Sequence, residues 1–363
     1  MSSGFSKLKI PFMYKVAIFL LGFLLYFKTV DYGFTLDDKL HITENEFVEK
    51  GWSGLSDVWT SDLMEGFQGG RMNNLLSGGR YRPLALTIHI LEEEIHGNDP
   101  GWGHLLNAFF CGVLGVVTLV FATKIFQNYS EEYAGWMALI CAAVFVVHPL
   151  HVEAVANIKN RDEMLACLLG LAGTNFFYTY FKYHQIRNVF LGAFFILLAL
   201  FTKESAANFI GIIVLLWFFQ FGFSIKKRKS AGITVLALVL PFAIMMVIRS
   251  MALSNEITAE GSVQLLNHVY LNASLPEKIA GIVFIYGLAL KLMVLPFPLT
   301  HDYYPYHPFR SYEELMDGYP QYPQTSDWQV IISLLVIVAL LVLMIRGFVK
   351  TQSSFTVRLL SFC

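Results

Sequence analysis

The sequence predicts an all-α protein that crosses a membrane several times, because long apolar segments alternate with short polar ones. Of its 363 residues, 55% are hydrophobic and only 15% are charged, whereas soluble domains carry about 25% charged residues. The mean hydropathy is +0.54. The apolar segments are longer than the short alternating strands of a transmembrane barrel. Composition and patterning therefore indicate a polytopic helical membrane protein.

About eight or nine apolar segments are candidate spanning helices. Several are shorter than the ~20 residues needed to cross a hydrocarbon core, which predicts closely spaced hairpins around a shared polar cavity. Residues 278–298 contain two prolines, so this segment is also a candidate re-entrant or interfacial helix. In chain order the segments are residues 14–30, 104–124, 134–148, 163–181, 189–203, 206–222, 231–249, 278–298 and 328–346.

Basic residues orient these segments, since cytoplasmic loops are enriched in Lys and Arg. Lys7 and Lys9 precede the first segment, Lys15 lies at its start, and no small-residue cleavage site follows it. We therefore expect a retained helix with a cytoplasmic N-terminus. A second cytoplasmic loop contains the basic run 226–229. Counting from these loops places three segments on the non-cytoplasmic side: residues 31–103, 149–162 and 203–205.

Residues 31–103 form a first outer loop that is too long for a simple connection. Within it, residues 45–60 mix apolar and polar side chains as an amphipathic helix on a membrane surface does. Residues 84–96 predict a second juxtamembrane helix. The Gly- and Asn-rich residues 66–80 predict a flexible loop.

Two adjacent carboxylates, Asp37 and Asp38, follow the first apolar segment in the stretch FTLDDKLHIT. A carboxylate near a membrane interface can act as a general base or hold a divalent cation. Adjacent carboxylates also repel each other, which raises one pKa toward the working range. The alternative is a solvated loop start beside Lys39.

Arg80 and Arg82 precede Pro83 in the stretch GGRYRPLALTIH. Guanidinium groups bind phosphate with two parallel hydrogen bonds. Interfacial arginines also anchor helices to lipid headgroups, so this alternative stays open.

The outer segment HPLHVEAVANIKNRDE, residues 148–163, is unusually rich in ionisable groups. On a helix, His148 and His151 would share one face, and with Glu153 they form a candidate metal site, although the spacing differs from HExxH. Arg161 lies near its end, followed by Asp162 and Glu163. Ionisable groups at such positions face a cavity or one another. A polar turn that satisfies its own groups is the alternative.

Lys203 and Glu204 interrupt a nearly continuous apolar stretch. An unpaired Lys in lipid costs several kcal/mol, so Lys203 meets water, a partner or an anionic ligand such as a lipid phosphate. The pair can equally be an exposed ion pair in a tight hairpin. Three weaker candidates for the cavity are His104, Asn107 and Asp302.

Several other chemistries are disfavoured. Three of the four cysteines lie in apolar segments and none forms a CxxC pair, so a disulfide framework and a zinc site are not expected. A Walker A motif, GxGxxG and a serine elbow are absent from the sequence, which argues against a nucleotide-driven pump.

Taken in order, the motifs DD, GRYRPLALTIH, GHLLN, HPLHVEAVANIKNRDEML, KES and LPFPLTHDYYP resemble the membrane region of TMTC-type proteins (transmembrane and tetratricopeptide-repeat O-mannosyltransferases) and their bacterial relatives. These belong to the GT-C glycosyltransferases. The resemblance covers about residues 14–345, and GRYRPL with HPLHVEAVAN is its most specific part. It implies a GT-C-type bundle with a long first outer loop.

The resemblance also implies a reaction. GT-C enzymes transfer a sugar, here mannose or a similar hexose, from dolichyl or undecaprenyl phosphate to an acceptor hydroxyl on the non-cytoplasmic face. That face is the periplasmic side of a bacterial inner membrane or the lumen of the endoplasmic reticulum. The acceptor is a protein or a glycan, and a divalent cation is a candidate cofactor, held by Asp37 and Asp38 if present.

Site residues follow from the same resemblance. Asp38, ahead of Asp37, is the expected base in an inverting transfer. The expected ligands of the donor phosphate are Arg80, Arg82, Arg161 and Lys203. The expected lining of the cavity is His104, Asn107, His148, His151, Glu153, Glu204 and Asp302.

The sequence departs from the family because no tetratricopeptide repeat follows the membrane region. We expect residues 1–346 to form one glycosyltransferase module and residues 347–363 to be a short tail of a truncated chain. The alternatives are a transporter or flippase for a lipid-linked or anionic substrate and an inactive truncated scaffold. Ionisable residues gather at one face and no internal repeat is visible, which favours interfacial chemistry over transport.

Overall fold

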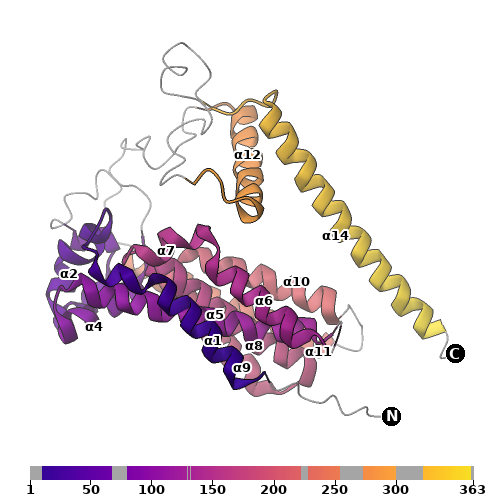
Figure 1. Cartoon of the computed structure of the whole chain (residues 1–363), viewed down its shortest axis with the longest axis horizontal. Coiled ribbons are helices and arrows are strands. Elements are labelled where there is room, and N and C mark those ends of the chain that lie inside the picture. The colour runs from indigo at the N-terminus through magenta and orange to yellow at the C-terminus, as the bar shows by residue number, and fades with distance from the viewer. Residues whose placement is uncertain are drawn as a thin grey trace. The chain divides into compact units, whose positions relative to one another are not determined.

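A computed structural model describes residues 10–67, 80–128, 130, 132–221, 228–253, 273–299 and 322–360 (Figure 1). The chain divides into two compact units, the first covering described residues up to 253 and the second those from 273 onward. Secondary structure in both units is helical. The main helices of the first unit are α1 Phe12–Tyr26, α2 Glu46–Glu49, α3 Leu55–Thr60, α4 Pro83–His96, α5 Pro100–Phe126, α6 Ala134–Val147, α7 Val152–Ala156, α8 Arg161–Tyr183, α9 Ile186–Thr202, α10 Asn208–Phe221 and α11 Arg228–Ala252.

The expectation of an all-α polytopic membrane protein is confirmed. Within the described residues, five helices are long and apolar enough to cross a membrane, and α6 with α7, bent by 48° at Pro149, is a sixth candidate. This number is below the eight or nine expected, because α9 and α10 have only 17 and 14 residues. The five are Phe12–Asp31, Pro100–Phe126, Arg161–Tyr183, Ala231–Ala252 and Trp328–Gly347.

The first unit is built around α1, α5, α6 and α8, with α9 against α8. Helices α1 and α5 approach closely through glycine. A Cβ atom on Gly22 would lie 3.0 Å from the Cα atom of Gly112, and one on Gly112 would lie 2.7 Å from the carbonyl oxygen of Phe19. Small residues allow such close packing between membrane helices. The contact fixes how α1 lies along α5.

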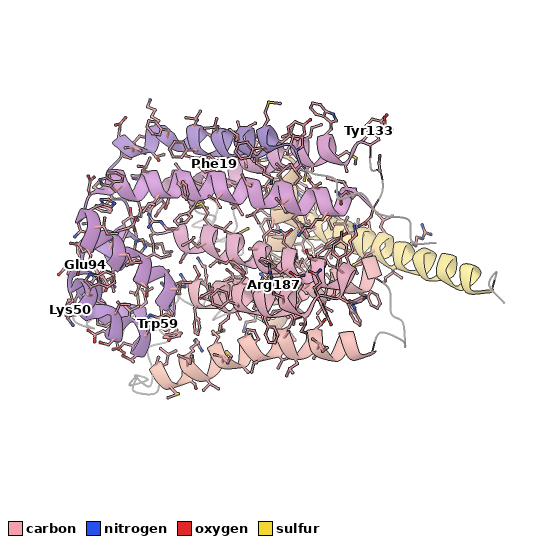
Figure 2. All side chains as sticks on the ribbon, turned by 90° about the horizontal axis from the view of Figure 1, so that it is seen from below. Phe19, Lys50, Trp59, Glu94, Tyr133 and Arg187 are labelled. Carbon is pink, nitrogen blue, oxygen red and sulfur yellow. The ribbon has the colours of Figure 1, made fainter. Side chains whose placement is uncertain are left out.

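Short helices gather at one end of this unit, where Lys50, Trp59 and Glu94 lie, whereas Tyr133 lies at the opposite end (Figure 2). The predicted helix over residues 45–60 is broken into α2 and α3, because Gly51 adopts φ +57°. The predicted juxtamembrane helix over 84–96 is confirmed by α4.

The second unit contains α12 Leu275–Val294 and α14 Trp328–Leu360. Its buried core consists of Ala280, Phe284 and Val330. Helix α12 corresponds to the segment expected at residues 278–298, and it ends before the two prolines. Helix α14 continues past residue 346 into the expected tail.

Candidate functional site

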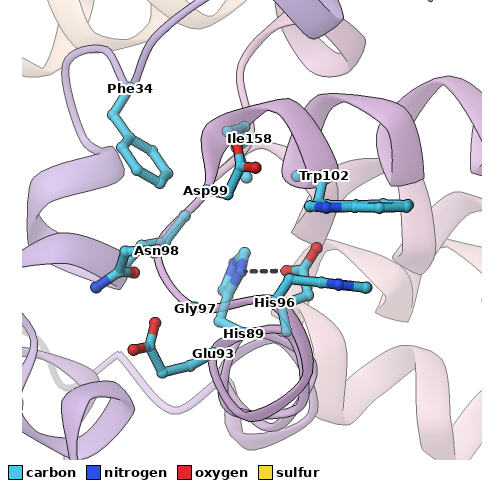
Figure 3. A pocket seen from close by; sticks show the side chains of 12 residues that line it. Phe34, His89, Glu93, His96, Gly97, Asn98, Asp99, Trp102 and Ile158 are labelled. Carbon is cyan, nitrogen blue, oxygen red and sulfur yellow. Dashed lines mark hydrogen bonds and ion pairs between the residues drawn. The ribbon is translucent and has the colours of Figure 1, made fainter.

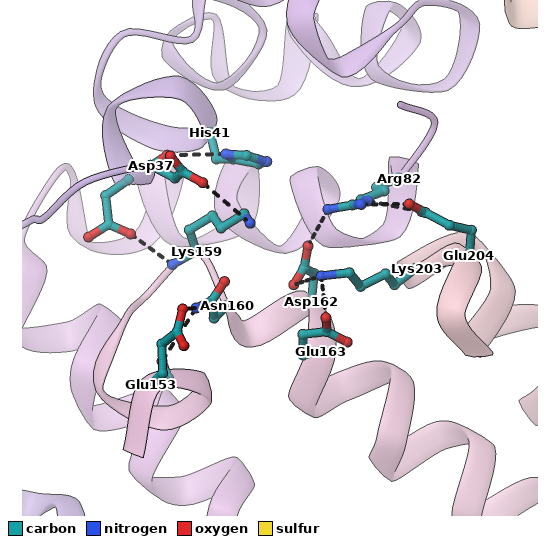
Figure 4. Close-up of polar contacts among 11 residues, drawn as sticks. Asp37, His41, Arg82, Glu153, Lys159, Asn160, Asp162, Glu163, Lys203 and Glu204 are labelled. Carbon is teal, nitrogen blue, oxygen red and sulfur yellow. Dashed lines mark hydrogen bonds and ion pairs between the residues drawn. The ribbon is translucent and has the colours of Figure 1, made fainter. Parts of the chain in front are cut away.

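The loop after α1 presents Asp37 to the turn between α7 and α8 (Figure 4), and Asp38 binds the same turn through the main chain of Lys159. Asp38 is fully buried. Its Oδ2 accepts the N–H of Thr35 over 2.7 Å, and its Oδ1 accepts the N–H of Lys159 over 2.8 Å. Both carboxylate oxygens therefore bind main-chain donors, which makes Asp38 a structural link between two segments far apart in the sequence.

Asp37 differs from its neighbour because its side chain is 54% exposed. Its Oδ2 lies 3.6 Å from Nζ of Lys159. The preceding Leu36 has φ 47°, in the left-handed region that non-glycine residues rarely adopt. Such strain is found where the surroundings impose a conformation, often at functional sites. Asp37 is thus an accessible carboxylate on a constrained turn.

Arg82 and Lys203 form an ion-pair network with three carboxylates (Figure 4). Arg82 donates to Glu204 over 3.0 and 2.6 Å and to the buried Asp162 over 2.8 Å. Lys203 Nζ lies 3.2 Å from Asp162 and 2.7 Å from Glu163. Although burial alone raises the pKa of Glu204, the hydrogen bonds and charge of Arg82 hold it at about 2.

The Asp37–Asp38 pair and the ion-pair network of Arg82 and Lys203 are linked by residues 159–162. Lys159 pairs with Asp37, and Asp162, three residues later at the start of α8, binds both Arg82 and Lys203. Asp37 and Asp38 thus contact the segment 148–161 at Lys159, and Lys203 contacts Asp162 and Glu163 directly after it. Residues from four distant parts of the sequence gather at this end of the unit.

Arg161 lies beneath this stretch and is fully buried. Its Nε donates to Asn107 Oδ1 over 2.6 Å, its Nη2 to the carbonyl of Gly103 over 2.8 Å, and its Nη1 to Glu92. Asn107 in turn donates to the carbonyls of residues 155 and 157 over 3.0 and 2.9 Å. All three guanidinium nitrogens contact protein groups, so Arg161 and Asn107 tie α4, α5 and the turn before α8 together.

The remaining expected residues are dispersed around this core. Nδ1 of His148 accepts the N–H of Leu150 over 3.3 Å, and the ring of His151 packs 4.6 Å from Phe145. Glu153 is exposed and weakly bonded to Asn160. Within the described part of the chain, no group of three His, Cys, Asp or Glu side chains is arranged to hold a metal. Asp302 lies outside the described residues.

Two further expected residues lie at the edges of the site. Nε2 of His104 lies 3.5 Å from the carbonyl of Gly33, so this ring contacts the loop that leads to Asp37. Arg80 is half-buried, and its main-chain N–H donates to the carboxylate of Asp62.

Sequence comparisons give a consistent set of relatives. The chain is 30% identical over 149 residues to the protein O-mannosyl-transferase Tmtc2 of Drosophila melanogaster, covering 41% of this chain and 15% of that protein. It is 28% identical over 224 residues to the protein O-mannosyl-transferase TMTC1 of Homo sapiens, covering 58% of this chain and 24% of the relative. The chain is TMTC-like.

The TMTC-like region spans less than a third of these relatives, since even the human TMTC4 match, 25% identical and covering 65% of this chain, extends over 30% of that protein. No family model and no solved structure matches the chain. The GT-C fold therefore stays a prediction.

The candidate site also contains residues that the sequence did not single out. His41 is buried, and its Nδ1 donates to the carbonyl of Asp37 over 3.1 Å. Burial, and then the charge of Lys159, hold its pKa well below the ordinary value, so its ring is neutral. Its position three residues after Asp38 is the sequence feature from which its place in the site could have been predicted.

Glu92 and His89 of α4 are the second addition. Nδ1 of His89 lies 3.1 Å from Glu92 Oε2, the oxygen that also accepts from Arg161. Both residues line a cavity of about 20 Å³ beside stacked His96 and Trp102 (Figure 3), a volume close to that of one water molecule. Their i, i+3 spacing placed them on one face of α4, but their partners are distant in sequence.

Proposed function

We propose that this chain is the membrane portion of a glycosyltransferase that moves mannose or a similar hexose from a polyprenyl-phosphate carrier to an acceptor hydroxyl on the non-cytoplasmic face. The similarity to proteins named O-mannosyl-transferases supports sugar transfer, with a protein as acceptor. The observation that carries the proposal is the exposed carboxylate of Asp37 on a constrained turn, next to a second cluster that contains Arg82 and Lys203.

Asp37 is the better base of the pair. A general base must reach its substrate and have an oxygen free to accept the proton. Asp38 is buried with both oxygens bound to main-chain N–H groups, whereas Asp37 is more than half exposed. We therefore reverse the order expected from the sequence. Asp37 takes the proton of the acceptor hydroxyl, and Asp38 fixes the loop that positions Asp37.

The step balances as a single displacement. The acceptor oxygen forms a bond to the anomeric carbon as its proton passes to Asp37, and the bond between that carbon and the phosphate oxygen breaks. The polyprenyl phosphate leaves with the electron pair. Attack from the face opposite the leaving group inverts the anomeric carbon.

The leaving phosphate needs a positive partner, because neutralising its charge stabilises the transition state. Of the phosphate ligands expected from the sequence, Lys203 and Arg82 belong to the cluster linked to the Asp37 turn through residues 159–162, but three carboxylates accompany these two cations. Glu163 and Glu204 are 48% and 59% exposed. The donor phosphate binds by displacing one of these exposed carboxylates, so the network holds the cations in place until the donor arrives. Arg80 stays a proposed ligand of the phosphate. The protein contacts of all three guanidinium nitrogens of Arg161 argue against such a role for that residue.

The described side chains do not fit a resident divalent cation. Asp38 has both oxygens occupied by N–H donors, and no further carboxylate or imidazole joins Asp37 in an arrangement that holds a metal. Whether transfer depends on a metal is decided by adding a chelator to the transfer assay.

The test uses the full chain reconstituted in lipid, with radiolabelled polyprenyl-phosphate mannose and a mixed protein acceptor extract. Asp37→Asn and Asp38→Asn are compared with the wild type, and the control is Asp57→Asn, a half-buried carboxylate on α3 that pairs with Lys50 away from the site. A parallel arm contains a chelator. We expect the wild type and Asp57→Asn to transfer label with or without the chelator, and Asp37→Asn to be inactive.

Each alternative gives a different result. Full activity of Asp37→Asn would contradict its role as the base. A folded wild-type protein that binds the donor and moves it across the bilayer without transfer would support the flippase reading instead. Loss of transfer with chelator alone would restore the metal to the mechanism.

A further inference from the structure

A second polar cluster lies at the end of α5 and α8 opposite Asp37. Both helices begin at the Asp37 end, where His104 and Arg161 lie, so their last turns lie on the other face of the unit. Lys124 belongs to the last turn of α5. Its Nζ donates to the carbonyl of Asn175 over 3.1 Å and to Oγ1 of Thr179 over 3.0 Å, both on α8.

The charge of Lys124 is not balanced by these contacts. Both partners are neutral, and none of the carboxylates in the described residues forms an ion pair with Lys124. Lys182, one turn beyond Thr179 on α8, also acts on it, and its charge has the same sign. An ammonium group that is largely withdrawn from water requires a counterion or a strong polar ligand.

An unused acceptor accompanies this unbalanced cation. The side chain of Asn175 is 7% exposed, and its Oδ1 has no hydrogen-bond partner among the described residues. Its Nδ2 is bound to the carbonyl of Leu171. Buried polar groups are usually satisfied by protein or by a ligand. The site therefore offers both a positive donor, Lys124, and a neutral acceptor, Asn175.

The depth of this cluster matches that of lipid headgroups. Lys124 lies two residues before the end of the spanning helix Pro100–Phe126, and headgroups begin where the apolar part of a span ends. Tyr133, at this end of the unit (Figure 2), and Trp136 are both exposed near the start of α6. Exposed Tyr and Trp are typical of the membrane–water interface.

We propose that Lys124 and Lys182 bind the phosphate of an anionic phospholipid on the face opposite Asp37, with Asn175 accepting a headgroup hydroxyl. Basic pockets between membrane helices bind such headgroups. Phosphatidylglycerol supplies both a phosphate and hydroxyl donors. The site is independent of the transfer reaction, because its residues lie at the other end of α5 and α8.

The experiment places the full chain in nanodiscs of phosphatidylcholine with increasing phosphatidylglycerol and measures the thermal midpoint and the retained lipid by native mass spectrometry. Variants are Lys124→Met, which removes the charge, and Lys124→Arg, which keeps it. The matched control is Arg187→Gln, an exposed cation at the start of α9, at the same end. A separate arm adds inorganic phosphate to phosphatidylcholine nanodiscs.

We expect phosphatidylglycerol to raise the thermal midpoint of the wild type and of Arg187→Gln, and Lys124→Met to bind it at least about tenfold more weakly because a charge-assisted hydrogen bond is lost. Lys124→Arg should retain binding. The proposal is overturned if Lys124→Met binds as the wild type does, or if Arg187→Gln loses as much. If Lys124→Met does not fold, an unchanged wild-type midpoint in phosphatidylglycerol overturns it. If inorganic phosphate raises the thermal midpoint as much as phosphatidylglycerol does, the phosphate bound at this site need not come from a lipid, and the lipid proposal is overturned.

Discussion

The main-chain N–H of Lys159 donates to the buried carboxylate of Asp38 over 2.8 Å, while its ammonium group lies 3.6 Å from the exposed carboxylate of Asp37. One residue thus contacts two adjacent acids in different ways. Asp38 is held by main-chain groups that cannot move independently of the fold. Asp37 is held by a flexible side chain that can yield to a substrate.

Substitution of the two acids should therefore separate stability from activity. Asp38→Ala leaves two N–H donors without an acceptor, and each buried unsatisfied donor costs about 1–3 kcal/mol. We expect the free energy of unfolding to fall by roughly 2–5 kcal/mol. Asp37→Ala should change it by no more than about 0.5 kcal/mol. Denaturant unfolding in detergent, followed by circular dichroism, measures both, and equal losses would contradict this division.

Removal of Arg161 should be more damaging than removal of any exposed cation. Arg161→Met leaves the largely buried Glu92 with only His89 as its partner, and breaking a buried ion pair on one side costs about 3–5 kcal/mol. The double variant with Glu92→Gln should recover part of that loss. The same unfolding measurement, arranged as a double-mutant cycle, checks the coupling. Additive effects would show that Arg161 acts without Glu92.

Acid should destabilise the protein through Glu92. Burial alone raises the pKa of this carboxyl, but the hydrogen bonds and charges of His89 and Arg161 lower it from 4.5 to about 2. Since the folded-state pKa is depressed, the stabilisation is fully present above pH 4.5 and is lost as the pH falls toward 2. The contribution is roughly 3 kcal/mol. The pH dependence of the unfolding free energy should flatten in Glu92→Gln, and an unchanged slope would refute this assignment.

If donor phosphate displaces a carboxylate from Lys203, removing that carboxylate should help the donor. Glu163→Gln should tighten binding of polyprenyl phosphate about fivefold, since it removes one competing negative charge near the surface. Lys203→Met should weaken binding. Equilibrium binding of a fluorescent polyprenyl phosphate checks both, with Asp57→Asn as the control. Weaker binding by Glu163→Gln would point to a direct role for that carboxylate.

The sequence predicts helix positions well where apolar runs are long. The segments expected at 104–124 and 163–181 correspond to Pro100–Phe126 and Arg161–Tyr183. Each helix begins a few residues early, because its first turn, with proline and glycine in α5 and charged residues in α8, does not contribute to an apolar run. The break of residues 45–60 at Gly51 depends on a positive φ that residue type alone does not fix.

Site residues are harder to predict, because a residue type does not reveal its neighbours. Arg161 and Arg82 are the same residue type and both are buried, yet one is tied to Asn107 and Gly103 and the other joins an ion-pair network that reaches the exposed Glu204. Asp37 and Asp38 are adjacent in sequence and differ only in which one the turn directs inward. Such distinctions arise from contacts between residues far apart in the chain, as between Glu92 and Arg161.

The glycine contact between α1 and α5 determines how Asp37 lies relative to Lys159. Helix α1 leads to Asp37, and α5 carries Asn107, which holds the turn that contains Lys159. Gly22 and Gly112 leave no room for a larger side chain. They thus fix the axial position of α1 relative to α5. A shift of α1 along α5 by one helical turn, about 5.4 Å, would carry Asp37 out of reach of Lys159. A methyl group added to either glycine, within a candidate membrane span, would in this way separate two charged groups that lie outside that span.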